Sequence, residues 1–150
     1  MVTAAIMAAL AVILSYIEIQ VGAVGGSINI VMLPIILVAY RYGALWGVGT
    51  GLVVGLVKCI IGGGIGWGLP SILLDYVLAY GAVGVAGFTR KLKFGLPIGA
   101  LIGAIARFGI HYISGVTIYA ITTATEISGI TTSNAWLYSL IYNGLYMLPS

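Results

Sequence analysis

Residues 95–119 read GLPIGALIGAIARFGIHYISGVTIY, and this stretch decides the fold class. It exceeds the roughly 20 residues that an α-helix needs to cross a bilayer, and only Arg107 and His111 within it can carry a positive charge. The rest of the 150-residue chain is similar, with 61% hydrophobic residues, 6% charged residues and a mean hydropathy of +1.19. Because this composition cannot cover a water-facing surface with polar groups, we expect an integral membrane protein.

Working outward from this stretch, we divide the chain at glycine, proline and charged residues and find five more apolar spans. The last span ends after about 15 residues, short of a full crossing, so we expect it to be truncated. The predicted fold is an all-α compact bundle of six transmembrane helices in a single domain, 1–150. The other five spans lie near 3–20, 28–41, 44–62 and 70–88, and from 134 onward.

Basic residues in two connections predict the orientation. Arg41 lies between the second and third spans, and Arg90, Lys91 and Lys93 lie between the fourth and fifth. The positive-inside rule places both connections, and with them the N-terminus, in the cytoplasm. Three connections then face outward, and the last is long enough to act as a lid. They comprise residues 20–27, 62–68 and 120–134.

Composition and motifs argue against several function classes. Six basic residues are too few and too scattered for a nucleic-acid surface. The single Cys59 has no neighbours spaced for metal binding, so we expect a small packing residue and no metal or cofactor. The sequence lacks a P-loop, because Lys58 follows Gly51 and Gly55 at the wrong spacing and no Ser or Thr follows the lysine. We therefore expect no ATP hydrolysis by this chain and no enzyme activity.

Many of the 23 glycines lie inside the spans, where small residues let membrane helices approach closely. We expect them to mark tight helix packing rather than a phosphate-binding loop. The glycines concerned are Gly47, Gly49, Gly51, Gly55, Gly99 and Gly103.

Ionisable residues inside the spans are candidates for function, because each costs at least a few kcal/mol in a bilayer. They are Lys58, Asp75, Arg107 and His111. Asp75 is either a structural ion-pair partner of Arg107 or Lys58, or a carboxylate that receives a cationic or amino-bearing ligand. His111 follows Arg107 by four residues and shares its helical face, so it is either a core hydrogen-bonding group or part of the same site.

Other polar and aromatic residues have two readings as well. Tyr138 and Asn143 are either interhelical contacts or site residues, and their five-residue separation does not place them on one ideal helical face. Most of the ten tyrosines fit an interfacial belt, but those beside Asp75 and His111 could form an aromatic wall around a cationic ring. The acidic side chains of Glu18 and Glu126 are expected to be solvated at the outer surface.

Several segments together resemble the thiamine-specific substrate-binding components of energy-coupling factor (ECF) transporters, and the likeness follows nearly the whole chain. In a well-known member of that family a glutamate stands at the position of Asp75, and a tryptophan at that of Tyr119. The segments are Met32-Leu33-Pro34-Ile35, Leu74-Asp75-Tyr76, residues 107–115 (RFGIHYISG), residues 138–144 (YSLIYNG) and Tyr146-Met147-Leu148-Pro149.

The resemblance implies a six-helix subunit of the prokaryotic plasma membrane that binds a vitamin near its outer face. It implies further that the subunit associates with a transmembrane coupling protein and two ATPase subunits. Ala5 and Ala9 match a small-residue pair that packs on the coupling protein. The positions that match substrate-binding residues are Asp75, Tyr76, His111, Gly115, Tyr119, Tyr138 and Asn143.

Thiamine offers a cationic thiazolium, a flat aminopyrimidine and a hydroxyethyl tail. The resemblance assigns Asp75 to the amino group or the cation, Asn143 and Tyr138 to the pyrimidine edge, and Tyr119 to stacking. A neutral His111 would lie beside the ring. Two alternatives remain open: the same architecture with another nitrogen-heterocycle nutrient, and a proton-linked transporter or channel.

Overall fold

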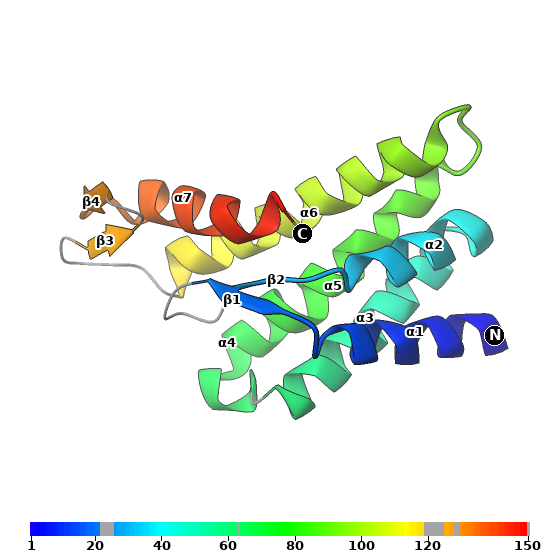
Figure 1. The fold of residues 1–150 in the computed structure, drawn as a ribbon, viewed down its shortest axis with the longest axis horizontal. Coiled ribbons are helices and arrows are strands. Elements are labelled where there is room, and N and C mark those ends of the chain that lie inside the picture. The colour runs from blue at the N-terminus through cyan, green and yellow to red at the C-terminus, as the bar shows by residue number, and fades with distance from the viewer. Residues whose placement is uncertain (22–25, 63, 119–124, 128–129, 150) are drawn as a thin grey trace.

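A computed structural model describes residues 1–21, 26–62, 64–118, 125–127 and 130–149. Figure 1 shows an elongated helical bundle with a short β-hairpin in each of two connections at one end. The helical elements are α1 (Val2–Leu14), α2 (Met32–Tyr42), α3 (Ala44–Ile61), η1 (Gly64–Trp67), α4 (Leu69–Ser71), η2 (Ile72–Leu78), α5 (Ala79–Val83), η3 (Gly84–Thr89), α6 (Gly95–Thr117) and α7 (Ala135–Met147). The strands are β1 (Ile19–Val21), β2 (Gly26–Ile28), β3 (Thr125–Ile127) and β4 (Ile130–Thr132).

Three helical segments within the described residues are long and apolar enough to cross a membrane, which confirms the predicted fold class. They are Ala44–Ile61, Leu69–Thr89 and Gly95–Thr117, and α4, η2, α5 and η3 together form the second of them. The predicted boundaries of these spans agree with the structure to within two residues. Gly43 has a φ of 102°, a conformation that favours glycine, and it separates α2 from α3.

The prediction of a first span over 3–20 is wrong at its outer end. Helix α1 stops at Leu14, and the hydroxyl of Ser15 donates a hydrogen bond to the carbonyl of Val12. Residues 17–21, Ile-Glu-Ile-Gln-Val, then alternate in polarity and are rich in β-branched side chains, a pattern typical of a strand. Strand β1 pairs antiparallel with β2, so the second helix also begins later than predicted, at Met32.

The predicted outer connection 120–134 contains a second antiparallel hairpin, β3–β4, in its described part. Helix α7 begins next to it at Ala135, as the sequence indicated. Asn134 caps this helix, because its side-chain oxygen accepts hydrogen bonds from the backbone N–H groups of Trp136 and Leu137.

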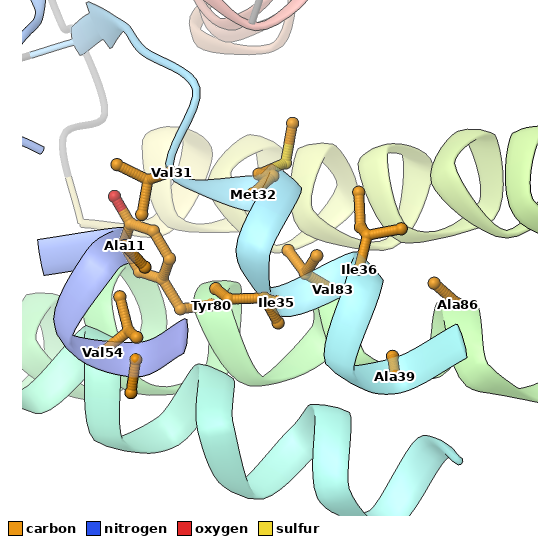
Figure 2. Close-up of a cluster of buried hydrophobic side chains, with 11 residues drawn as sticks. Ala11, Val31, Met32, Ile35, Ile36, Ala39, Val54, Tyr80, Val83 and Ala86 are labelled. Atoms are coloured by element: carbon orange, nitrogen blue, oxygen red, sulfur yellow. The ribbon is translucent and has the colours of Figure 1, made fainter. Parts of the chain in front are cut away.

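The core lies among α1, α2, α3 and α5, where Tyr80 is surrounded by small and branched side chains (Figure 2). Close packing of α3 on the helix Leu69–Thr89 explains the glycines. A Cβ on Gly51 would overlap the carbonyl of Tyr80, and one on Gly55 would overlap that of Tyr76. Gly49 is an exception to the packing prediction, because it is exposed and its Cβ would point into open space.

Candidate functional site

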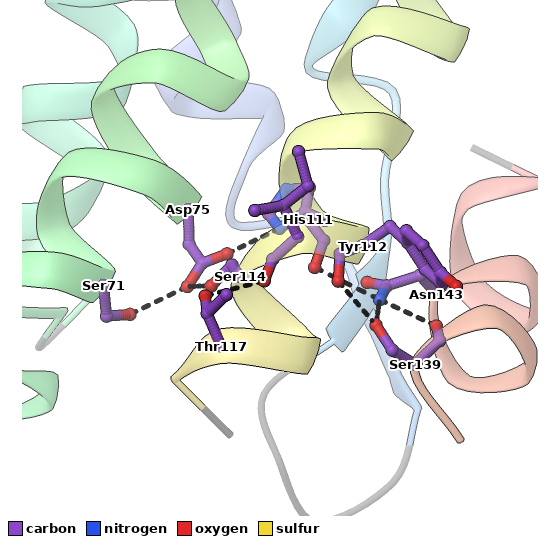
Figure 3. A network of polar contacts seen from close by, with 9 residues as sticks. Ser71, Asp75, His111, Tyr112, Ser114, Thr117, Ser139 and Asn143 are labelled. Carbon is purple, nitrogen blue, oxygen red and sulfur yellow. Dashed lines mark hydrogen bonds and ion pairs between the residues drawn. The ribbon is translucent and has the colours of Figure 1, made fainter. Parts of the chain in front are cut away.

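The carboxylate of Asp75 accepts three hydrogen bonds from side chains of two helices (Figure 3). Ser71 Oγ lies 2.9 Å and Ser114 Oγ 2.7 Å from Oδ2, and His111 Nδ1 lies 3.0 Å from Oδ1. The side chains of Asp75 and His111 are 15% and 12% exposed. The site is therefore a largely buried carboxylate with three hydrogen-bonding partners, and two of the predicted residues meet in it.

Helical spacing brings these groups together. Ser71 and Asp75 are four residues apart in the segment Leu69–Thr89, and His111 and Ser114 are three apart on α6, so each pair shares a helical face. Asp75 also lies in a π-helical stretch, η2, a wider helical turn that often occurs at functional sites. The sequence analysis did not predict Ser71, although its i, i+4 relation to Asp75 could have identified it.

The carboxylate of Asp75 retains capacity for one more donor. An ionised carboxylate only accepts hydrogen bonds and has about four acceptor positions. Among the described residues, two donors occupy Oδ2 and one occupies Oδ1, so the remaining position lies on Oδ1. Against an ionised Asp75, Nδ1 of His111 carries the hydrogen of the contact between them.

Helix α7 is joined to α6 through contacts of Asn143, Ser139 and Gly115. Asn143 is buried, and its Nδ2 donates to the carbonyl of Ser139 at 2.9 Å, to Ser139 Oγ at 3.1 Å and to the carbonyl of His111 at 3.4 Å. The hydroxyl of Ser139 donates to the carbonyl of Tyr112 at 3.0 Å. A Cβ on Gly115 would overlap this hydroxyl. The predicted residues Gly115 and Asn143 therefore hold α7 against α6 beside the carboxylate site.

Two sets of packed aromatic side chains lie on α6 and α7. Tyr112, next to His111, stacks on Phe108 with ring centroids 6.2 Å apart and packs against Trp136 at 5.8 Å. The rings of Tyr138 and Tyr142 stack at 6.0 Å on α7.

The other two predicted tyrosines differ in what the structure shows. The ring of Tyr76 packs against Gly64 in η1. Tyr119, the predicted stacking residue, lies outside the described residues.

The other ionisable residues of the spans form a separate cluster. Lys58 pairs with Glu18 at 2.8 Å, and the two side chains are 15% and 23% exposed. The prediction that Glu18 is a solvated surface group is therefore wrong. Among the described residues, Asp75 makes no ion pair with Arg107 or Lys58, and its partners are the two serines and His111.

Arg107 contacts an aromatic ring rather than a carboxylate. Its guanidinium lies 4.5 Å from the ring centroid of the buried Tyr80, and Lys58 Nζ lies 6.0 Å from the same centroid. Arg107 is 4% exposed, and within the described residues its Nε and Nη1 make no hydrogen bond. Cation–π attraction stabilises the buried Arg107 against the ring of Tyr80.

Helix α1 has one face on the bundle and one face outside it. Ala4, Ala8 and Ala11 are buried, whereas Ala5 and Ala9 are exposed. The predicted partner-binding pair therefore lies on the face of α1 that is turned away from the bundle. In the part of the chain that the structure describes, no group of three His, Cys, Asp or Glu side chains could hold a metal ion.

Fold and site together define a class: a polytopic helical membrane protein with a hydrogen-bonded carboxylate near one end of its bundle. Comparison with known proteins narrows this class. The family model described as thiamine transporter protein (Thia_YuaJ) matches residues 1–150, and the chain belongs to this family.

Individual relatives agree with the family assignment. The chain is 34% identical over 139 residues to the thiamine transporter ThiT of Bacillus subtilis strain 168. This alignment covers 84% of this chain and 69% of that protein. It is 33% identical over 156 residues to ThiT of Lacticaseibacillus paracasei, with coverages of 93% and 75%. A solved structure of ThiT from Listeria monocytogenes superposes with a TM-score of 0.80 at 27% identity, covering 99% of this chain and 84% of that one.

Proposed function

We propose that this chain is the thiamine-binding subunit of an ECF-type uptake transporter, with Asp75 and His111 at the centre of its binding site. The observation that carries the proposal is the carboxylate of Asp75, held by donors from two helices in a chain that matches the thiamine transporter family throughout. The subunit captures thiamine at the outer face of a prokaryotic plasma membrane, with its N-terminus in the cytoplasm. It forms one substrate-binding domain over residues 1–150.

The free acceptor position on Oδ1 of Asp75 suits the amino group of the aminopyrimidine. A neutral His111 adds no second positive charge beside the ligand, and Tyr76 and Tyr138 offer aromatic surface for a cationic ring. Asn143 and Gly115 contribute by fixing α7 against α6, the helix that carries His111. An analogue without a matching donor leaves a buried acceptor unpaired, which costs about 1–3 kcal/mol and makes the site selective.

Tryptophan fluorescence of the detergent-purified protein tests the proposal. Trp136 packs on Tyr112, next to His111, whereas Trp46 lies on α3 near the end of the bundle opposite Asp75 (Figure 1). We expect saturable quenching by submicromolar thiamine that is lost in Trp136→Phe and kept in Trp46→Phe. A flat response in protein shown to be folded would contradict thiamine binding.

Energy for uptake comes, in this proposal, from a separate coupling protein and two ATPase subunits, which contact the exposed face of α1. Ala5 and Ala9 lie on that face, where small residues permit a close helix contact. Replacing both with leucine should leave thiamine binding unchanged and abolish uptake when the coupling subunits are present. Val53→Leu, on an exposed apolar position of α3, is the matched control and should leave uptake intact. Normal uptake by the double variant would contradict this interface.

A further inference from the structure

The charges of this chain are sorted between the two ends of the bundle. Arg41, Arg90, Lys91 and Lys93 are exposed at the α2–α3 turn and in the loop between η3 and α6. Figure 1 shows these two connections at the same end, away from both hairpins. The acidic residues lie elsewhere: Glu18 and Asp75 toward the opposite end, and Glu126 on β3. Four of the six basic residues thus share one surface that no acidic residue joins.

Arg90 connects the two basic segments. Its guanidinium crosses from the η3–α6 loop to the α2–α3 turn, where a Cβ built on Gly43 would fall 2.9 Å from Nη1. The flexible Arg90 side chain could move away from such a Cβ, so the preference for glycine at position 43 comes from its positive φ. The contact nevertheless brings the cations of both connections onto one continuous surface.

Large apolar side chains are interleaved with these cations. Phe88 is 80% exposed and Phe94 is 65% exposed. Lys93 Nζ lies 5.9 Å from the ring centroid of Phe94, and Arg41 Cζ lies 5.8 Å from that of Tyr42. Exposed aromatic rings beside snorkelling cations are typical of the level at which a helix leaves the hydrocarbon region.

We propose that this surface, the basic collar formed by Arg41, Arg90, Lys91 and Lys93, binds the phosphate of an anionic phospholipid. The apolar rings lie where acyl chains begin, and the cations lie where headgroup phosphates are found, so one lipid molecule satisfies both. An acidic protein surface would meet the same charges, but it would leave Phe88 and Phe94 without the hydrocarbon surroundings that their exposure requires.

Native mass spectrometry of the full chain, released from nanodiscs of equal phosphatidylglycerol and phosphatidylcholine, tests the proposal. We expect retained lipid to be enriched in phosphatidylglycerol. Lys91→Gln/Lys93→Gln should reduce the enrichment by at least about fivefold, the contribution of one basic residue at an anionic surface. Lys91→Arg/Lys93→Arg keeps both charges and should keep the enrichment.

Four results would overturn the proposal. The first is equal retention of both lipids by the unmodified chain. The second is unchanged enrichment in the glutamine variant, with thiamine binding confirming that it is folded. The third is a glutamine variant that keeps its lipid preference but no longer assembles with the coupling subunits, which would assign the collar to a protein partner. Inorganic phosphate should not displace the retained lipid, because it lacks acyl chains, and displacement would likewise contradict a lipid site.

Discussion

Replacing Asp75 with asparagine separates the charge of this residue from its shape. The amide can place its nitrogen where Oδ2 now lies, because both serine hydroxyls can rotate from donating to accepting. The remaining oxygen can still accept from His111. Every partner thus keeps a hydrogen bond, and we expect the thermal stability of the variant to change little.

Ligand binding should respond much more strongly than stability. The amide oxygen keeps the acceptor position but loses the charge. A hydrogen bond to a charged acceptor contributes about 1–1.5 kcal/mol more than one to a neutral acceptor, so binding should weaken by about 5- to 13-fold. Isothermal titration calorimetry should therefore show this loss for thiamine in Asp75→Asn. An analogue with an oxo group in place of the amino group has no donor at that position for Asp75. It should bind the original protein weakly and lose nothing further in the variant.

The comparison of the two ligands decides what Asp75 contacts. Equal losses for thiamine and the oxo analogue would refute the amino-group contact and assign Asp75 to the thiazolium charge. Unchanged thiamine affinity would remove Asp75 from the binding site altogether. Glu18→Gln makes the same chemical change at a carboxylate that pairs with Lys58 instead, and it should leave the ratio of the two affinities unaltered.

Two further predictions concern the stability of the bundle. Gly115→Ala forces a methyl group onto the hydroxyl of Ser139 and should lower the free energy of unfolding by about 1–3 kcal/mol. Gly109→Ala, on the same helix, meets open space and should not. Equal melting temperatures of the two variants would contradict this packing. Glu18→Gln should destabilise by about 1.5–3 kcal/mol in thermal unfolding, because it leaves a mostly buried Lys58 without its counter-charge. The charge-reversed pair Glu18→Lys/Lys58→Glu should recover much of that loss, and no recovery would show that the pair does not act as a unit.

Hydrophobic run length predicts the long helices well, because a bilayer-spanning helix must be apolar over its whole length. Run length fails where an apolar run changes from a helix into a strand, whose backbone forms hydrogen bonds with another segment. Residues 3–20 look like one span, yet α1 ends at Leu14 and a strand follows, since β-branched alternation leads into pairing with a later segment. The partner strand is remote information that a single window of sequence does not contain. The same applies to η2, because nothing in ILLDYVL distinguishes a π-helix from an α-helix.

The charged members of the candidate site could be predicted from the sequence. The cost of burying Asp75 and His111 in a bilayer singled them out, and the structure places Oδ1 of Asp75 3.0 Å from Nδ1 of His111. Gly115 and Asn143 were named as binding residues only through the family resemblance; the structure places both in the α6–α7 contact, and their contact with a substrate stays a prediction. Spacing along a helix does not tell whether a polar group faces a ligand or a neighbouring backbone carbonyl.

The helical hairpin formed by Leu69–Thr89 and α6 explains why the carboxylate site and the basic collar occur together. Asp75 lies on one arm and His111 on the other, while the loop that carries Arg90, Lys91 and Lys93 joins the two arms at the opposite end. Ser114 and His111 donate hydrogen bonds that hold the arms together, and each such bond is stronger in low dielectric than in water. A lipid held at the loop would fix the depth of the same hairpin in the bilayer. The chemistry at each end thus depends on one structural unit, and substitutions in the loop should leave the hydrogen bonds of Asp75 intact.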